Sequence, residues 1–172
     1  GTWCLTGIVT EKPVRKTEIM KYNLANEGMW EEKNRLLANS TGMWLIQKLL
    51  KEWNSKNSDF DFSVLTEMAG KSKGFKSFMN VNDKRFMKPT SMENVIKEYI
   101  DTDLSRGEIV RLCLEGLAFD SRKTRELLED LTDRKMNKIH IVGGGIKNDL
   151  FCQMVANAND KLVQTGPAES TA

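Results

Sequence analysis

Three successive glycines form the segment of this sequence best suited to binding chemistry. Gly143, Gly144 and Gly145 follow a short apolar stretch and precede Asn148, which opens a segment with helical spacing. Because glycine has no Cβ, a ligand can approach the backbone closely, and N–H groups are exposed beside a helix N-terminus. Phosphates or the edge of a nucleotide suit such a surface. The alternative is a tight strand-to-helix turn that binds nothing, and the glycines alone leave both open.

The segment matches neither of the common glycine-rich phosphate motifs. Its letters from Val142 to Asn148, VGGGIKN, fit neither GxGxxG nor GxxxxGK[ST]. Dinucleotide-binding and P-loop motifs are therefore excluded. No Ser/His/Asp or Cys/His arrangement can be argued from spacing either.

The other groups that could do chemistry favour structural roles. His140 is the only histidine and lies in an alternating stretch with no second ligand nearby, so we expect a packed or edge histidine. Asp59 with Asp61, and Asp101 with Asp103, could be imagined as metal carboxylates. Each pair stands at an expected helix start, where an acid stabilises the helix dipole, so capping is the better interpretation. We assign no metal ligand in the chain.

The cysteines and the charge pattern exclude several classes of protein. Cys4, Cys113 and Cys152 are widely spaced and form no CxxC pair, which indicates neither a disulfide framework nor a zinc site. The 26 basic and 24 acidic residues are interleaved, so neither nucleic acid nor a membrane is expected as a partner. Apolar runs are far shorter than the roughly 20 residues of a membrane span. A reducing, cytoplasmic location is the simplest expectation.

Periodicity predicts the elements that position these groups. Residues 2–9 alternate as a strand does, and the Asn26–Gly28 segment is expected to turn the chain into a strand over about 29–38. Apolar residues then recur at helical spacing after Gly42.

The middle of the chain is predicted to hold shorter elements and a long connection. An amphipathic helix is expected over about 62–69, and residues 70–90, rich in Lys, Gly, Ser and Asn, are predicted to be a surface connection. Thr90 with Glu93 fits a capping box at the start of a helix. The tryptophans are expected in the core: Trp30, Trp44 and Trp53.

A second capping box opens the longest predicted helix. Ser105 with Glu108 precedes an apolar stripe that could run to about residue 133. Gly116 lies within it, and a residue without a Cβ there suggests the close approach of another backbone.

The last third predicts alternating strands and helices. A strand is expected over 138–142, a helix capped by Asn148 or Asp149, a short strand at Leu162 and Val163, and a helix start at 166–169. This alternation predicts an α/β domain with a mixed sheet and helices on its faces.

Several motifs together resemble the FGGY carbohydrate kinases. The resemblance covers essentially the whole chain, and its motifs occur in the right order at compatible spacing. Two further segments point, within that family, to the branch that phosphorylates L-rhamnulose. The family motifs are Gly1–Trp3, Asn26–Gly28, Asn39–Gln47 and Ile141–Asn148, and the branch motifs are Asn80–Asp83 with Phe86 and Pro89, and Gly166–Glu169.

The resemblance implies an actin-like fold and a phosphotransferase activity. Family members have two ribonuclease-H-like domains with the active site in the cleft between them. The N-terminal domain carries most of the sugar site, and the C-terminal domain binds ATP. Residues 1–172 would be most of the second domain, without the first. Members of the branch transfer the γ-phosphoryl group of MgATP to the 1-hydroxyl of L-rhamnulose, which implies ATP and Mg²⁺ as cofactors.

The resemblance also implies roles for particular residues. Thr2 would hydrogen-bond ATP phosphates, and Gln47 matches a family contact to ATP. Gly144 would lie against the nucleotide, in a loop shaped by Gly143 and Gly145.

Two asparagines complete the residues implied by the resemblance. Asn148 would lie near the adenine, and Asn39 matches a position assigned to the sugar. A purely structural alternative remains for Asn39 as a helix N-cap, as it does for Gln47 as an exposed helix residue.

The family's catalytic base is expected to lie outside this chain. Family members carry a general-base Asp some twenty residues upstream of the motif that here begins at Gly1. The chain starts without Met and stops at Ala172, within an expected helix, so we expect a domain truncated at both ends. No catalytic residue is therefore assigned, and the chain alone is expected to be inactive and prone to self-association through unpaired edges.

Two other functions stay open at this point. One is an FGGY kinase for another ketose or a deoxy sugar, because most sugar contacts would lie in the other domain. The other is a non-catalytic module that binds nucleotide or serves as a scaffold.

Overall fold

The computed structural model describes residues 4–56 and 58–168. Residues 166–168 are not helical, and the rest of the helix start predicted at 166–169 lies outside the described residues. In chain order the elements are β1 (Cys4–Thr10), α1 (Glu18–Lys21), β2 (Leu24–Gly28), η1 (Trp30–Glu32), β3 (Asn34–Ser40), α2 (Trp44–Asn54), α3 (Phe62–Lys71), η2 (Lys84–Phe86), α4 (Met92–Ile100), α5 (Arg106–Thr132), β4 (Lys138–Ile141), η3 (Gly144–Lys147), α6 (Asp149–Asn159) and β5 (Leu162–Thr165), where η marks a 3₁₀ helix.

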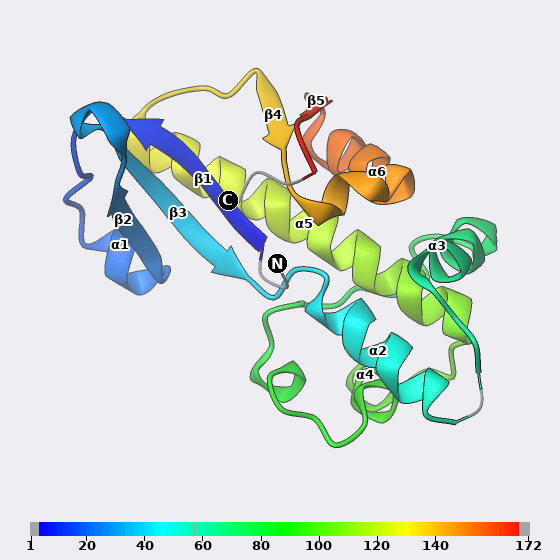
Figure 1. Ribbon diagram of the computed structural model, residues 1–172. Helices are drawn as coiled ribbons and strands as arrows, with labels where there is room; N and C mark the ends of the chain where they lie inside the picture. The colour runs from blue at the N-terminus through cyan, green and yellow to red at the C-terminus, as the bar shows by residue number, and fades with distance from the viewer. Residues whose placement is uncertain (1–3, 57, 169–172) are drawn as a thin grey trace.

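Helix α5 runs through the middle of the molecule, and the other layers pack around it (Figure 1). The strands β1 and β3 lie along its C-terminal half, α2 and α3 contact its N-terminal half, and α6 packs beside it. Helix α4 packs on α2, and the pair β4 and β5 packs next to α6. Its predicted capping box is confirmed: Ser105 Oγ accepts from the N–H of Glu108, and the Glu108 carboxylate accepts from the N–H of Ser105. The helix has 27 residues, close to the predicted length. No helix formed by the described residues is long and apolar enough to cross a membrane.

The first three strands form an antiparallel sheet in the order β1-β3-β2. Leu36 and Leu37 of the central strand β3 are buried, whereas residues 4–9 of β1 alternate between half-buried and exposed and Thr10 is buried. The turn predicted at Asn26–Gly28 is wrong, because those residues end strand β2. The chain reverses instead through η1, where Glu31 and Glu32 adopt φ values of +59° and +56°.

The last two strands form a separate parallel pair. β4 and β5 are in register from Lys138 opposite Leu162 to Ile141 opposite Thr165. Helix α6 connects them, as a parallel pair requires a crossover. The predicted strands and helix are confirmed, and both parallel and antiparallel pairing occur in the domain.

The connection predicted over 70–90 is more than a surface loop. Met79, Val81 and Phe86 are buried in the main core, so the prediction of a surface connection is wrong for this part. A Cβ atom at Gly116 would lie 2.7 Å from Val81 Cγ1 and 3.1 Å from the Met79 carbonyl oxygen. The close approach predicted at Gly116 is therefore confirmed, and this connection is what approaches.

The tryptophans differ in burial. Trp53 is fully buried and donates from Nε1 to the Glu93 carboxylate at 2.8 Å. Trp44 is half-buried, with Lys48 Nζ 4.4 Å from its ring centroid. Trp30 is 87% exposed, so its expected core position is wrong. It lies in the tight turn between β2 and β3, which projects away from the core.

Helix α4 is capped by a residue other than the one predicted. Ser91 Oγ accepts from the N–H of Asn94 at 3.2 Å, and the Glu52 carboxylate accepts from Ser91 Oγ at 2.6 Å and from the N–H of Met92 at 2.7 Å. The capping box predicted from Thr90 is wrong, because the carboxylate that completes the cap comes from α2. Burial acts to raise the pKa of Glu52, but hydrogen bonds from Ser91, Lys56 and the N–H groups of Glu93 and Met92 together lower it.

Replacing the observed cap should destabilise the fold, whereas replacing the predicted one should not. We expect Ser91→Ala to lower the free energy of unfolding by about 1–2 kcal/mol, because it removes the cap and one bond to Glu52. Thr90→Ala is the matched control, and we expect a change within about 0.5 kcal/mol at this exposed residue. Urea unfolding followed by circular dichroism measures both. Equal losses in the two variants would contradict the assignment of the cap.

A cluster of charged residues around buried Glu129 ties the end of α5 to the connection before β4. The Glu129 side chain is 5% exposed; Oε1 accepts from the N–H of Met136 and from Arg125 Nη1, each at 2.8 Å. Lys135 Nζ lies 3.2 Å from its other oxygen. The hydrogen bond from Met136 outweighs burial and, with Arg125 and Lys135, lowers the pKa of Glu129 to about 2.

The lowered pKa predicts a pH-dependent stability. Because the folded pKa of Glu129 lies below its usual value of 4.5, its stabilisation is present above about pH 5 and is lost as the pH falls towards 2. We expect Glu129→Gln to lower the free energy of unfolding at pH 7 by about 2–3 kcal/mol, and by much less at pH 2.5. Glu126→Gln, at an exposed ion pair, should change it by less than about 1 kcal/mol. Urea unfolding curves at both pH values measure these changes. If Glu129→Gln lowered the free energy of unfolding equally at both pH values, the lowered pKa of Glu129 would be contradicted.

Candidate functional site

The glycine segment forms a turn whose start is held by two backbone hydrogen bonds to the segment after β5. Gly143 adopts φ +82° and ψ −170°, and its N–H donates to the Pro167 carbonyl at 3.1 Å. The N–H of Gly166 donates to the Ile141 carbonyl at 2.7 Å. The turn is thereby tied to the segment that follows β5, and η3 begins directly after Gly143.

The turn is open on the side where the glycines lack side chains. A Cβ atom at Gly143 or Gly144 would meet no other heavy atom within 4 Å, and one at Gly145 would lie 3.9 Å from Phe151 Cε1. This space lies directly against the backbone. It fits the close approach of a flat or anionic ligand, as the glycines predict.

Asn148 holds the turn in place with both ends of its amide. Its Oδ1 accepts from the N–H of Phe151 at 2.9 Å, so the predicted cap of α6 is confirmed. Its Nδ2 donates to Thr66 Oγ1 of α3, also at 2.9 Å. Thr66 is a partner that sequence reasoning missed, because it lies 82 residues away.

Asn39 and Gln47 lie on either side of the junction between β3 and α2. Asn39 is exposed, opposite Leu5 of β1. It is a strand residue and does not cap α2, whose N-cap position is Met43, so the structural alternative for Asn39 is wrong. Gln47 is half-buried in the first turn of α2, and Thr2 lies outside the described residues.

The acidic pairs and the histidine occupy ordinary positions. Asp61 caps α3 by accepting from the N–H of Val64 at 2.8 Å, as predicted. Asp101 stands at the end of α4 with φ +53°, so the predicted start is wrong there, and Asp103 is paired with Lys97 at 3.3 Å. His140 is exposed in β4, opposite Gln164. In the described part of the chain, no three His, Cys, Asp or Glu side chains gather to hold a metal ion.

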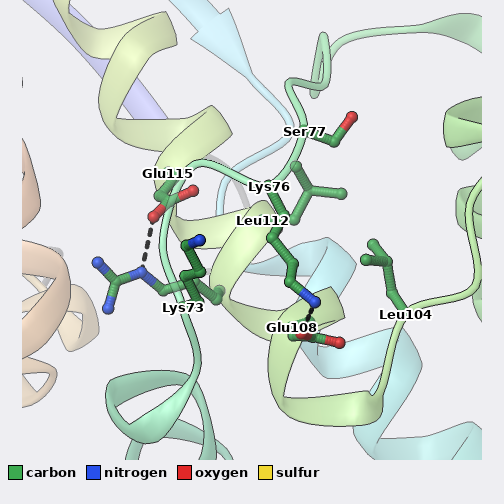
Figure 2. Close-up of a pocket in the computed structure, with 8 residues that line it drawn as sticks. Lys73, Lys76, Ser77, Leu104, Glu108, Leu112 and Glu115 are labelled. Carbon is green, nitrogen blue, oxygen red and sulfur yellow. Dashed lines mark hydrogen bonds and ion pairs between the residues drawn. The ribbon is translucent and has the colours of Figure 1, made fainter.

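One small hollow away from these residues is lined mainly by charged groups (Figure 2). Arg111 Nε donates to Glu115 at 2.7 Å, and Lys76 pairs with Glu108. The bond from Lys76, with those from Ser105, lowers the pKa of Glu108 to about 2. The hollow has room for about one water molecule, with a volume of about 10 Å³. It contains none of the predicted site residues and has no room for a nucleotide.

A larger hollow of about 380 Å³ lies next to it, lined by Phe78, Met79, Tyr99, Gly116 and Phe119 among others. Phe78 and Phe119 pack against each other, with ring centroids 5.9 Å apart. No residue predicted to bind ATP or sugar lines this hollow.

The domain description that matches the sequence is the C-terminal domain of the FGGY family of carbohydrate kinases, over residues 1–172. The chain belongs to this family. The family resemblance of the sequence motifs is therefore confirmed over the whole chain.

Curated relatives of this FGGY chain are named rhamnulokinases. Those of Bacteroides thetaiotaomicron, Halalkalibacterium halodurans and Bacillus subtilis are 38%, 33% and 33% identical to it. Each alignment covers 100% of this chain and 36%, 37% and 36% of the relative, respectively. The chain thus spans little more than a third of the length of these relatives.

A solved structure shares the fold. The xylulose kinase of Rhodospirillum rubrum superposes with a TM-score of 0.63 at 16% identity, covering 99% of this chain and 34% of that one. The predicted actin-like α/β fold of this FGGY domain is confirmed.

The two open glycines should respond differently to the same substitution. Gly143→Ala forces a side chain into the φ +82° conformation, and we expect a loss of about 1–3 kcal/mol in the free energy of unfolding. Gly144 has open space and no positive φ, so Gly144→Ala should change it by less than about 0.5 kcal/mol. Chemical unfolding of both variants measures the difference. A loss as large for Gly144→Ala would show that the space above the turn is occupied.

Proposed function

We propose that this chain is the nucleotide-binding part of a kinase that transfers the γ-phosphoryl group of ATP to the 1-hydroxyl of L-rhamnulose. The observation that carries the proposal is the open glycine turn, found in a chain that aligns over its whole length with rhamnulokinases. In this proposal a nucleotide approaches the backbone of the turn closely, because Gly143 and Gly144 lack the Cβ atoms that would occupy the open space there.

The residues take distinct parts in this proposal. Gly144 lies against the nucleotide, while Gly143 and Gly145 give the turn its shape. Asn148 holds the turn on α3 and keeps it near the adenine. Gln47 contacts ATP from the first turn of α2.

Two further contacts belong to the proposal. Asn39, exposed on β3, contacts the sugar, which places a sugar group and an ATP group on the two sides of one junction. Thr2 contacts the phosphates, as the family motif implies.

The reaction needs positioning more than covalent chemistry from this domain. The O1 atom of the sugar forms a bond to the γ-phosphorus as the bond from that phosphorus to the oxygen bridging to the β-phosphate breaks, and the hydroxyl proton passes to a general base. Holding both substrates in line supplies much of the rate of such a transfer. We assign the general base to the part of the rhamnulokinases that lies outside their alignment with this chain.

Mg²⁺ is proposed as a companion of the nucleotide. Among the described residues, no three His, Cys, Asp or Glu side chains gather at one place where a metal ion could bind. We therefore derive no step of the reaction through Mg²⁺ and assign no residue of this chain to it.

A chimeric enzyme tests the proposal directly. The matching C-terminal part of the Bacteroides rhamnulokinase is replaced by this chain, and ATP-dependent phosphorylation is measured with L-rhamnulose, xylulose and other ketoses. We expect activity with preference for L-rhamnulose, and only weak ATP binding without transfer by the chain alone. Preference for another ketose would favour another branch of the family, and ATP binding without any transfer in the chimera would favour a non-catalytic module.

The glycine turn has its own test within the chimera. We expect Gly144→Ala to raise the KM for ATP about tenfold, because the methyl group occupies the space proposed for the nucleotide. Gly28→Ala is the matched control, since a Cβ there also meets nothing within 4 Å, and its KM should stay within about twofold. Equal values for the two variants would remove the turn from the nucleotide site.

A further inference from the structure

We propose that Asn82 is a positioning residue that sets the junction between β3 and α2, and with it the sugar-facing Asn39. This inference rests on the proposed function for its kinetic consequence. Its structural part stands on the contacts of Asn82, which belongs to the Asn80–Asp83 motif.

The side-chain carbonyl oxygen of Asn82 contacts the residues of the junction. Its Oδ1 accepts from the N–H of Thr41 at 3.0 Å, and it lies 3.1 Å from Thr41 Oγ1 and 3.3 Å from Ser40 Oγ. Ser40 is the last residue of β3 and follows Asn39 directly. A single amide oxygen thus gathers the two residues that link the sheet to helix α2.

The other end of the amide is anchored on α5. Asn82 Nδ2 donates to Asp120 Oδ1 at 2.8 Å, near the middle of the long helix. The backbone N–H of Thr41 can only donate, which requires an acceptor, while the Asp120 carboxylate requires a donor. An amide side chain provides both in one planar group, so Asn suits this position chemically.

The surrounding motif presents Asn82 in this orientation. Asn80 Oδ1 accepts from the N–H of Asn82 at 3.1 Å, and the Val81 carbonyl accepts from Thr41 Oγ1 at 2.9 Å. Val81 is buried against Gly116 of α5. The motif therefore bridges the junction and the long helix, with Val81 buried and Asn82 exposed.

The geometry predicts which substrate is affected when the amide is lost. Asn39 is one residue from Ser40, so it moves with the junction. Gln47 lies on α2, whose Leu45 and Leu49 are fully buried, so the core holds it independently. Loss of the amide should therefore weaken the sugar contact more than the ATP contact.

An exchange of charge between the two partners tests this. In Asn82→Asp a carboxylate faces Asp120 at 2.8 Å, and the like charges repel. Asn82→Asp combined with Asp120→Asn restores one donor and one acceptor in the reverse order. Asn94→Asp is the matched control, because it makes the same change at an exposed residue of α4.

Kinetics in the chimera give the first readout. We expect Asn82→Asp to raise the KM for L-rhamnulose about tenfold with the KM for ATP within about twofold, and the double variant to return most of the loss. Asn82→Ala, which adds no charge, should move the same KM in the same direction. Unchanged KM values in folded Asn82→Asp, or no recovery in the double variant, would overturn the inference.

Amide hydrogen exchange of the chain alone gives a readout that needs no activity. The N–H of Thr41 should exchange faster in Asn82→Asp, slow again in the double variant, and be unaffected by Asn94→Asp. If the wild-type chimera is inactive, the proposed function fails while the exchange rates still decide whether Asn82 sets the junction. An unchanged exchange rate for Thr41 would refute it.

Discussion

The packing of α5 requires backbone distances that only glycine permits. A Cβ at Gly107 would lie 2.6 Å from Ser72 Oγ and 2.8 Å from the Met68 carbonyl oxygen, and one at Gly116 would collide with Val81. Each glycine inside a helix costs about 1 kcal/mol relative to alanine. That cost is offset because α3 and the 79–81 segment can then pack directly on the helix backbone. The other layers take their positions from this helix, so the arrangement of the domain depends on these close approaches.

The same helix contacts both regions of the candidate site, the junction between β3 and α2 and the helix that follows the glycine turn. On one side, Asp120 holds Asn82 and through it the junction beside Asn39. On the other side, Arg125 Nε donates to Asn159 Oδ1 at 3.0 Å, in a buried contact that fixes the end of α6. Helix α6 begins at the glycine turn, so α5 connects the region of this turn with the junction beside Asn39. Segments that are far apart in the sequence are thus positioned by one helix, α5.

Sequence reasoning succeeded where a residue's partner lies within about one helical turn. The capping box of Ser105 and the cap at Asn148 are local, and periodicity revealed α2, α3, α5 and α6. It failed at Thr90, because the carboxylate that completes the true cap comes from α2. It failed again over 70–90, where abundant polar residues concealed buried Met79 and Val81. The glycine turn was predictable, but Thr66 and Asp120 reach the site from far along the chain and leave no local pattern.

The glycine turn divides its roles between one side chain and its backbone. The side chain of Asn148 is committed to Phe151 and Thr66, so it serves to hold the turn. What the turn presents outward is backbone, and the N–H groups that open a helix have no partner within it. Recognition by backbone depends on shape and charge, so it suits an anionic ligand and carries little information about a sugar. In the proposed arrangement, discrimination between sugars comes from side chains elsewhere, and Asn39 is the residue of this chain that we propose for that contact.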